Sequence, residues 1–387
     1  MKARVLTLTL VLAALAAPVS AQSLFGSVGL GLPVDAVDGR ARALGNMGLG
    51  LSGASLLPTD PAAAARAPLP NGILVAQPSW ADASAGAETD YFQGTRFPLV
   101  AAGYPVLGGV ASVFFSSHLE QDFTGSRETS VDLGGSSVIA RDSFDQDGAL
   151  SSINLGFSRM ITRETSVGVS VGRYTGTIRR RLVRTIESPD STAVLPYISD
   201  GGWTYSGYRV TGGAATRVLD IVNMSVSATW STSLDAEAST STSGGDGSFD
   251  LPLQLRLGAS APLAPGLTLS ASAMRADWSG VRDALSGGGD AGVELAYGGG
   301  LELTQARLLG RSAPIRLGFR HTDLPFSPAG ESASERIFAG GLGLVLNQAN
   351  ELILAGVDVG VERGRRTAGS LVENFWRGTV SLRLAGL

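Results

Sequence analysis

Long segments of this chain alternate between apolar and polar residues at every second position. From residue 222 to 230, each even-numbered residue is apolar and each odd-numbered residue is polar. The same period recurs at 251–258, 353–362 and 376–384. Successive side chains of a β-strand point to opposite faces, so this period is typical of strands with one apolar and one polar face. We therefore predict an all-β protein.

The alternating segments are long and numerous. We predict fourteen strands, at 72–80, 97–104, 107–120, 148–162, 165–180, 202–218, 221–235, 248–261, 266–278, 291–304, 312–322, 334–346, 351–363 and 373–385. Many exceed the roughly five to six residues of a typical globular strand. Tilted strands that cross a membrane need about 9–11 residues. The lengths therefore favour membrane-spanning strands.

The connections between these strands fall into two sets. Short turns, such as 105–106 and 219–220, alternate with long polar loops, such as 81–96, 121–147 and 181–201. Short turns at one end and long loops at the other are typical of an outer-membrane β-barrel. We predict a transmembrane antiparallel barrel of about fourteen strands, whose two ends both lie on the periplasmic side.

The five tryptophans support the same orientation. They are Trp80, Trp203, Trp230, Trp278 and Trp376, and all fall near the long-loop ends of their predicted strands. Indole side chains favour the membrane–water interface. We expect the tryptophans to mark the outer interface.

The composition agrees with a barrel and excludes other classes. Hydrophobic residues make up 44% and charged residues only 17%, which is unlike a disordered chain. The 30 basic against 34 acidic residues are unlike a nucleic-acid-binding protein. The charge-free stretch 97–119 is long enough for a membrane helix, but Pro105, Gly108 and Gly109 interrupt it and favour a hairpin.

The N-terminus has the layout of a secretory signal peptide. Lys2 and Arg4 precede an apolar stretch at 5–17 and small residues at 19–21. This order of regions is typical of a cleaved export signal. We predict a signal peptide at 1–21, a plug segment at 22–71 and a barrel domain at 72–387.

The segment before the barrel carries the motifs of a known family. Residues 39–48 read Gly-Arg-Ala-Arg-Ala-Leu-Gly-Asn-Met-Gly, and 60–63 read Asp-Pro-Ala-Ala. This resembles the start of FadL-like outer-membrane transporters and the related PorV-like proteins, where Gly-Ala-Arg-Ala-x-Gly-Met-Gly precedes Asn-Pro-Ala. An Asp stands at residue 60, where the family usually has Asn. The residues that carry the resemblance are Arg40, Arg42, Gly45, Met47, Gly48, Asp60 and Pro61.

The resemblance implies a function as well as a fold. It implies that 22–71 fold into the lumen as a plug, in a protein of the outer membrane of a Gram-negative bacterium. It further implies passive uptake of hydrophobic small molecules such as long-chain fatty acids, released when the plug shifts. The alternative is a PorV-like scaffold or shuttle for secreted proteins that transports no small molecule. The expected partners are outer-membrane lipid and a hydrophobic ligand, or secreted proteins under the alternative, and no nucleic acid.

Strand parity identifies charged side chains that face the lumen. These are Arg256, Glu294, Glu302, Arg316, Arg320, Asp358, Arg377 and Arg383. Guanidinium groups bind carboxylates through paired donors, so the candidate ligand-binding residues are Arg256, Arg316, Arg320 and Arg377. The alternative is that these arginines pair with the lumen carboxylates or with Asp60 of the plug.

No complete pattern for catalysis or metal binding is present. Asp142, Asp145 and Asp147 have a spacing that could hold Ca²⁺, but the closing Glu of an EF-hand is missing, and we interpret them as a solvated acidic loop. The chain has no Cys, and its two histidines, His118 and His321, are far apart in sequence, so we predict no metal site. A nucleophilic serine in a Gly-x-Ser-x-Gly turn is missing. We predict neither enzymatic activity nor a cofactor. The 52 glycines are expected where the barrel wall approaches the plug closely and in turns.

Overall fold

The computed structural model describes residues 23–85, 88–133, 136–187, 195–240, 242, 245–285, 290–328, 330–349 and 352–386. The predicted signal peptide lies outside these residues. Within them, no helix is both long and apolar enough to cross a bilayer.

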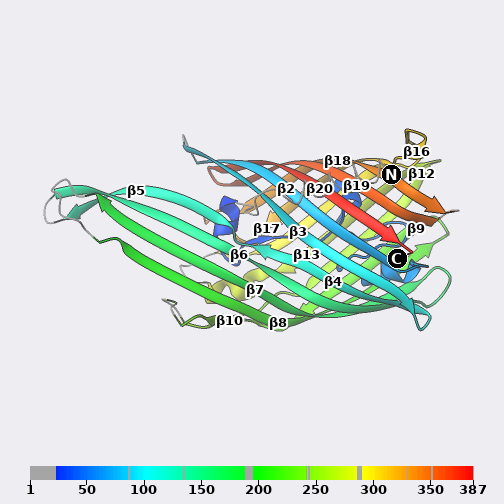
Figure 1. Cartoon of the computed structure of the whole chain (residues 1–387), viewed down its shortest axis with the longest axis horizontal. Helices are drawn as coiled ribbons and strands as arrows, with labels where there is room; N and C mark the ends of the chain where they lie inside the picture. Colours follow the sequence, from blue (N-terminus) through cyan, green and yellow to red (C-terminus); the bar gives the residue numbers. More distant parts are fainter. Residues whose placement is uncertain are drawn as a thin grey trace.

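Fourteen of the described strands form a closed antiparallel barrel (Figure 1). In barrel order they are β2 (Asn71–Ala85), β3 (Glu88–Val106), β4 (Gly109–Glu120), β6 (Ser136–Met160), β7 (Ser166–Glu187), β8 (Tyr197–Val218), β9 (Val222–Ser231), β12 (Gln254–Ala264), β13 (Leu267–Asp277), β14 (Val293–Leu303), β17 (Ile315–Leu324), β18 (Ala333–Ala349), β19 (Leu352–Ala368) and β20 (Leu371–Ala385). Antiparallel pairing of β2 with β20 closes the barrel. Each predicted strand overlaps one of these, so the predicted fold is confirmed.

Smaller elements lie inside the barrel or extend from it. They are η1 (Leu24–Ser27), β1 (Leu32–Pro33), α2 (Gly39–Ala43), η2 (Pro61–Arg66), β5 (Phe123–Leu133), β10 (Leu234–Ala238), β11 (Gly247–Phe249), η3 (Trp278–Ala284), β15 (Arg307–Leu308) and β16 (Arg311–Ser312).

The two faces of the wall follow the alternation of the sequence. On β9, Val226 and Trp230 are 55% and 56% exposed, whereas Ser225 and Thr229 are buried. Apolar side chains therefore cover the outside of the barrel and polar ones face the lumen. This distribution is the one a barrel needs in a lipid bilayer.

The long-loop end is more regular than predicted. The segments 81–96, 121–147 and 181–201 were expected to be loops, but most of their described residues lie in strands. β5 pairs with β6, and β6 pairs with β7 as far as Ile139 opposite Glu187. Figure 1 shows this sheet projecting beyond the rest of the barrel. Val138, Ala140 and Asp142 of this extension are buried and Ile139 is 49% exposed, so the two faces still differ in burial. The apolar–polar alternation of the sequence fades there while the backbone ladder continues.

The tryptophans divide into two groups. Trp80, Trp230 and Trp376 are about half exposed on the outer surface, as predicted. Trp278 is buried, and Trp203 packs against the same internal apolar cluster. The interface prediction was wrong for these two. The chain turns inward at η3, which places the Trp278 ring in the lumen.

Residues 23–70, which we call the plug, lie inside the barrel. α2 contacts β17, β18, β19 and β20, whereas η2 contacts β4, β6, β7 and β8. The plug thus spans the lumen from one side of the wall to another. Its Phe25, Leu30 and Leu49 are buried.

Glycines let the wall accept the plug backbone at close range. A methyl group at Gly318 of β17 would lie 2.2 Å from the carbonyl carbon of Leu44. One at Gly258 of β12 would lie 2.5 Å from the carbonyl oxygen of Leu49. Side chains at these positions would push the plug away. The close-approach role expected for glycine therefore holds at these contacts.

Candidate functional site

A network of buried charges joins the plug to the wall. The Arg316 guanidinium lies 2.7 Å from Glu302 and 2.6 Å from Asp358. Arg40 of the plug contacts the other oxygen of Glu302 at 2.6 Å, and Arg383 contacts Asp358 at 2.6 Å. Glu302 is therefore shared between an arginine of the barrel and one of the plug.

A second part of the network centres on Asp35 of the plug. Arg320 lies 2.8 Å from Asp35 and 3.3 Å from Glu335. Arg42, also in the plug, lies 3.9 Å from Asp35 and 3.8 Å from Glu362. Burial raises the pKa of Asp35, but Arg320 and Arg42 outweigh it and hold that pKa below its usual value. Asp35 therefore remains a carboxylate at neutral pH.

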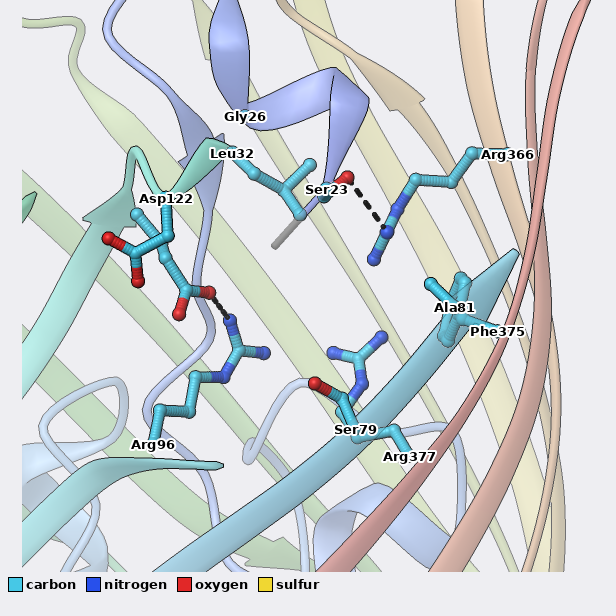
Figure 2. Close-up of a pocket in the computed structure, with 11 residues that line it drawn as sticks. Ser23, Gly26, Leu32, Ser79, Ala81, Arg96, Asp122, Arg366, Phe375 and Arg377 are labelled. Carbon is cyan, nitrogen blue, oxygen red and sulfur yellow. Dashed lines mark hydrogen bonds and ion pairs between the residues drawn. The ribbon is translucent and has the colours of Figure 1, made fainter. Parts of the chain in front are cut away.

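The third part surrounds Arg377. Its guanidinium lies 3.3 Å from Glu362 and 3.8 Å from Glu335. Figure 2 shows Arg377, Arg366 and Arg96 facing one small cavity beside the start of the plug. This cavity is about 30 Å³, which is room for about one water molecule. It is too small for an organic ligand.

Three of the four candidate arginines therefore already contact carboxylates. These are Arg316, Arg320 and Arg377. Only Arg320 pairs with a carboxylate of the plug, Asp35, and Asp60 makes no ion pair with any of the three among the described residues. Sequence parity assigned these arginines to the lumen, but it could not identify Asp35 because the plug has no strand pattern.

Asp60 lies elsewhere, at the start of η2. It is buried, and its Oδ1 has no hydrogen-bond partner in the described part of the chain. Burial raises the pKa of Asp60 to about 6, against the opposing effects of Ser225 and Arg66. The next residue, Pro61, packs on Gly168 of β7, where a methyl group would lie 2.5 Å from the Pro61 carbonyl.

Arg256 differs from the other three candidates. It is 9% exposed, and its Nε and Nη1 have no hydrogen-bond partner among the described residues. Its Nη2 donates to Gln254 at 2.9 Å. Arg256 lines the same cavity as His118 and Tyr174. It therefore has donors available beside an internal space.

A second buried arginine stands at the same place. Arg209 is 4% exposed, and its Nη1 lies 2.5 Å from His118 Nε2. Its guanidinium carbon lies 5.7 Å from the centre of the Tyr174 ring. Within the described residues, neither Arg209 nor Arg256 forms an ion pair. His118 accepts the hydrogen bond from Arg209 on an unprotonated ring nitrogen, so it is not itself a cation. We call Arg209 and Arg256 the cation cluster.

Arg209 was not predicted, although a signal for it existed. The residues around it alternate, with Tyr208 and Val210 apolar and Arg209 and Thr211 polar. This parity places Arg209 in the lumen. His118 was considered only as a metal ligand, and among the described residues no group of acidic, histidine or cysteine side chains could hold a metal ion.

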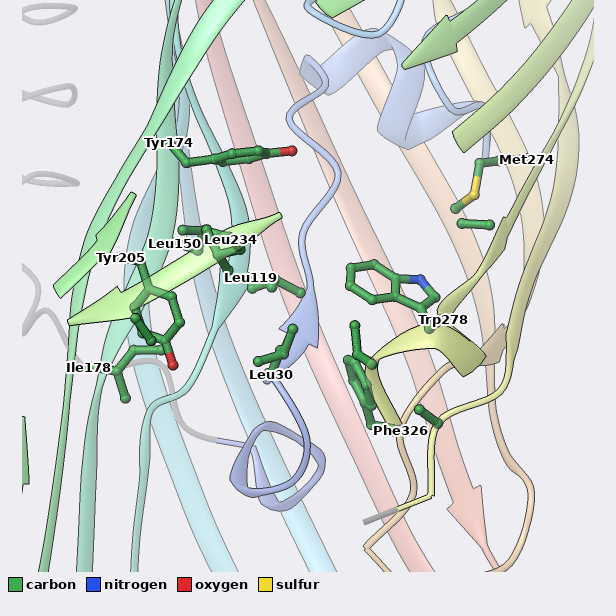
Figure 3. Packing of buried hydrophobic residues seen from close by; sticks show 14 of the residues in the cluster. Leu30, Leu119, Leu150, Tyr174, Ile178, Tyr205, Leu234, Met274, Trp278 and Phe326 are labelled. Atoms are coloured by element: carbon green, nitrogen blue, oxygen red, sulfur yellow. The ribbon is translucent and has the colours of Figure 1, made fainter. Parts of the chain in front are cut away.

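An apolar cluster adjoins the cation cluster on the long-loop side (Figure 3). Figure 3 shows Leu30 of the plug below Leu119, with Tyr205 and Ile178 to its left and Trp278 and Phe326 to its right. The cavity beside Arg256 is about 40 Å³ and is lined by Leu119, Trp278 and other members of this cluster, and also by Asp35 and Glu294. Apolar side chains, the Arg256 guanidinium and two carboxylates therefore meet at one point of the lumen.

The other face of the plug borders a larger space. A cavity of about 550 Å³ lies at the short-turn end, between the plug and the ends of β14, β17, β18, β19, β20 and β2. Arg40, Arg316 and Arg383 form part of its floor, and Leu56 and Ile353 part of its walls. The plug and the charge network thus separate this cavity from the apolar cluster.

Comparison with known proteins identifies the fold. No protein-family model matches the sequence, and no curated protein matches it. A FadL homologue of Pseudomonas aeruginosa superposes with a TM-score of 0.65 at 10% identity, covering 92% of this chain and 100% of that one. The fold is that of the FadL-like outer-membrane channels.

Two further solved structures agree. The toluene transporter TodX of P. putida has a TM-score of 0.60 at 14% identity, over 91% of this chain and 99% of that one. The CymD monoaromatic hydrocarbon channel has a TM-score of 0.53 at 11% identity, over 95% and 97%. At these identities the similarity concerns the fold. A closed barrel of this type with an apolar exterior is built for the outer membrane.

Proposed function

We propose that this protein is a channel for passive uptake of hydrophobic small molecules that carry a carboxylate, such as long-chain fatty acids. One observation carries the proposal: among the described residues, the two buried arginines of the cation cluster form no ion pair, have guanidinium nitrogens without hydrogen-bond partners, and adjoin an apolar cluster. The carboxylates of Asp35 and Glu294 line the same cavity as Arg256 but make no direct contact with it. A buried charge without a counter-charge is costly. A ligand carboxylate would supply a direct ion-pair partner, and its hydrocarbon chain would contact the apolar side chains. The cavity of about 40 Å³ beside Arg256 is too small for such a ligand while the plug is docked, so a shift of the plug has to make the room.

Arg256 is the predicted ligand-binding residue that best suits this role. Arg209 and His118 join it in the proposed site. Arg316, Arg320 and Arg377 are less suited to this role, because these three already have carboxylate partners. Their role in ligand binding stays a prediction. The printed names of the structural neighbours, a toluene transporter and a monoaromatic hydrocarbon channel, support hydrophobic compounds as the general class.

In this proposal the plug controls the path that the ligand takes through the lumen. It fills the lumen between the cation cluster and the cavity at the short-turn end. We propose that export directed by residues 1–21 delivers the chain to the outer membrane of a Gram-negative bacterium. A shift of the plug would then open the path for the ligand. In this function the protein catalyses no reaction.

The test compares a carboxylate with a neutral compound. The variant Arg209→Gln/Arg256→Gln is reconstituted in vesicles, and uptake of oleate and of toluene is measured. Each charge-assisted hydrogen bond contributes about 1.5–3 kcal/mol, so oleate affinity should fall at least about tenfold while toluene uptake is retained. Arg275→Gln is the control, because Arg275 is exposed on the outside of β13. Unchanged oleate uptake in the double variant would contradict the proposal.

The PorV-like alternative is tested on the purified protein. Mass spectrometry of the membrane-extracted barrel identifies bound lipids and co-purifying proteins. Bound fatty acid supports the transporter. A stoichiometric secreted protein without any lipid ligand would instead support a scaffold for protein secretion.

A further inference from the structure

In three short turns of the barrel, a leucine has a positive φ angle, which is a backbone conformation that glycine, asparagine and aspartate adopt more readily. Leu107, Leu219 and Leu309 have φ angles of 54°, 53° and 51°. Two-residue hairpin turns with such angles favour Asn, Asp and Gly, because a larger side chain crowds the backbone there. Among the described residues, the only other non-glycine residue with positive φ is Asp220, beside Leu219.

The same leucines are almost fully exposed. Leu107, Leu219 and Leu309 are 85%, 83% and 93% exposed. Ile161, in a further short turn, and Leu263, at the end of β12 just before another short turn, are 63% and 57% exposed. Water disfavours such side chains, so at Leu107, Leu219 and Leu309 both the backbone and the solvent act against leucine. An apolar medium at the turns would remove the second penalty.

All five residues lie at one end of the barrel. The turns join β3 to β4, β6 to β7, β8 to β9, β12 to β13 and β14 to β17, at the end where β2 begins and β20 finishes. The apolar outer surface continues into them. Tyr104 and Val106 are exposed just before Leu107, and Ile221 is exposed just after Leu219. The tips therefore extend the lipid-facing surface.

The distribution of the tips suits a bilayer better than a protein. They are spread over five connections along the wall instead of forming one patch. Basic residues accompany them: Arg163 follows Ile161, Arg217 precedes Leu219, and Arg307 and Arg311 flank Leu309. Arginine can keep its stem in apolar surroundings while its guanidinium binds a phosphate.

We propose that the five short turns are a membrane anchor that inserts into the phospholipid leaflet on the short-turn side. The apolar tips contact the upper part of the acyl chains, and the neighbouring arginines contact the lipid phosphates. The anchor would set the depth of the barrel in the bilayer. It is independent of the proposed transport function.

Because the chain contains no Cys, a single introduced cysteine can be labelled specifically, and the depth of that position in the bilayer can be measured. Single variants Leu107→Cys, Leu219→Cys and Leu309→Cys are labelled with a polarity-sensitive fluorophore in phosphatidylethanolamine–phosphatidylglycerol vesicles. Leu257→Cys, lipid-facing on β12, calibrates the acyl region, and Asp246→Cys calibrates water. Fluorophores at the three tips should have emission maxima between those of the two reference variants. They should be quenched more by lipids carrying a spin label near the head group than by lipids labelled deep in the chain.

Emission equal to that of the Asp246→Cys reference, with full quenching by aqueous iodide, would overturn the anchor. The tips would then be open to a soluble protein instead. A second measurement compares Leu309→Gln with Leu195→Gln, a matched exposed leucine at the long-loop end, 88% exposed. Gln is used because Asn would also relax the positive-φ backbone at Leu309. Leu309→Gln should lower the folding equilibrium constant in vesicles by up to about tenfold, whereas Leu195→Gln should leave it unchanged. Equal values for the two variants would also contradict the anchor.

Discussion

The guanidinium of Arg320, on β17, lies 2.8 Å from the carboxylate of Asp35 in the plug. Arg320 is buried, and it also contacts Glu335 of the neighbouring strand β18. The plug is therefore held to the wall by an ion pair whose wall partner is fixed by a second carboxylate. This contact and the glycine contacts are separate means of docking, and they can be tested separately.

We expect Asp35→Asn to loosen the plug. The variant leaves Arg320 and Arg42 with less counter-charge in a buried place. Removing one partner of a fully buried pair costs about 3–5 kcal/mol, and the partial exposure of Asp35 lowers this figure. Hydrogen exchange should become faster over residues 35–49. Glu128→Gln, which removes an exposed ion pair with Arg141, should leave the plug unchanged. Identical exchange in wild type and Asp35→Asn would show that the pair does not hold the plug.

We expect Gly318→Ala to displace the plug by steric contact. The added methyl group would lie 2.2 Å from the Leu44 carbonyl carbon. Overpacking of this kind costs about 1–3 kcal/mol. The control is Gly340→Ala on the neighbouring strand, where the nearest atom would be 3.6 Å away. Limited proteolysis should cut the plug faster only in Gly318→Ala. Equal cleavage of Gly318→Ala and Gly340→Ala would contradict a steric displacement of the plug.

We expect the docking of the plug to weaken as the pH rises from 4 through about 6. Burial raises the pKa of Asp60 to about 6 from the usual 3.8, so the docked plug binds a proton more readily than the undocked plug. The associated stability is present at pH 4 and is lost as the pH rises through about 6. Asp60→Asn should remove this dependence and strengthen docking at pH 7 by up to roughly 3 kcal/mol.

The pH effect is measured by hydrogen exchange of residues 57–67, corrected for the intrinsic pH dependence of exchange. Wild type should show weaker protection at pH 7 than at pH 4, and Asp60→Asn should show equal protection. Asp246→Asn, at an exposed position, should behave as wild type. Stronger wild-type protection at pH 7 than at pH 4 would contradict the role of Asp60.

We expect Leu30→Ala to open the apolar cluster. Leu30 is 2% exposed and lies between the two sides of the cluster (Figure 3). Truncating a buried leucine leaves a cavity and costs about 2–5 kcal/mol. Toluene uptake into vesicles should increase, because the plug then fills less of the lumen. Leu257→Ala, on the lipid-facing surface, is the control. A lower toluene uptake in Leu30→Ala would indicate that Leu30 helps to bind the ligand.

The faces of the wall were predictable from the sequence. Lipid requires apolar side chains at every second position, and this requirement is visible in the alternation of residues such as Ser225 and Val226. The extensions beyond the bilayer were not predictable, because lipid no longer requires apolar side chains at every second position there. The inward position of Trp278 depends on the turn at η3, which interrupts the strand parity.

The sequence by itself determined the side of the wall on which each strand residue lies, because a strand has a period of two and the bilayer accepts only one of its faces. Only the tertiary structure decided which lumen charges neutralise one another. Arg320 and Asp35 meet although 285 positions separate them in the chain. Arg209 and Arg256 face the same lumen but form no ion pair among the described residues, although Asp35 and Glu294 line the cavity of Arg256. The reason is that ion pairing depends on the path of the plug and on barrel closure, which bring together residues that no local pattern relates.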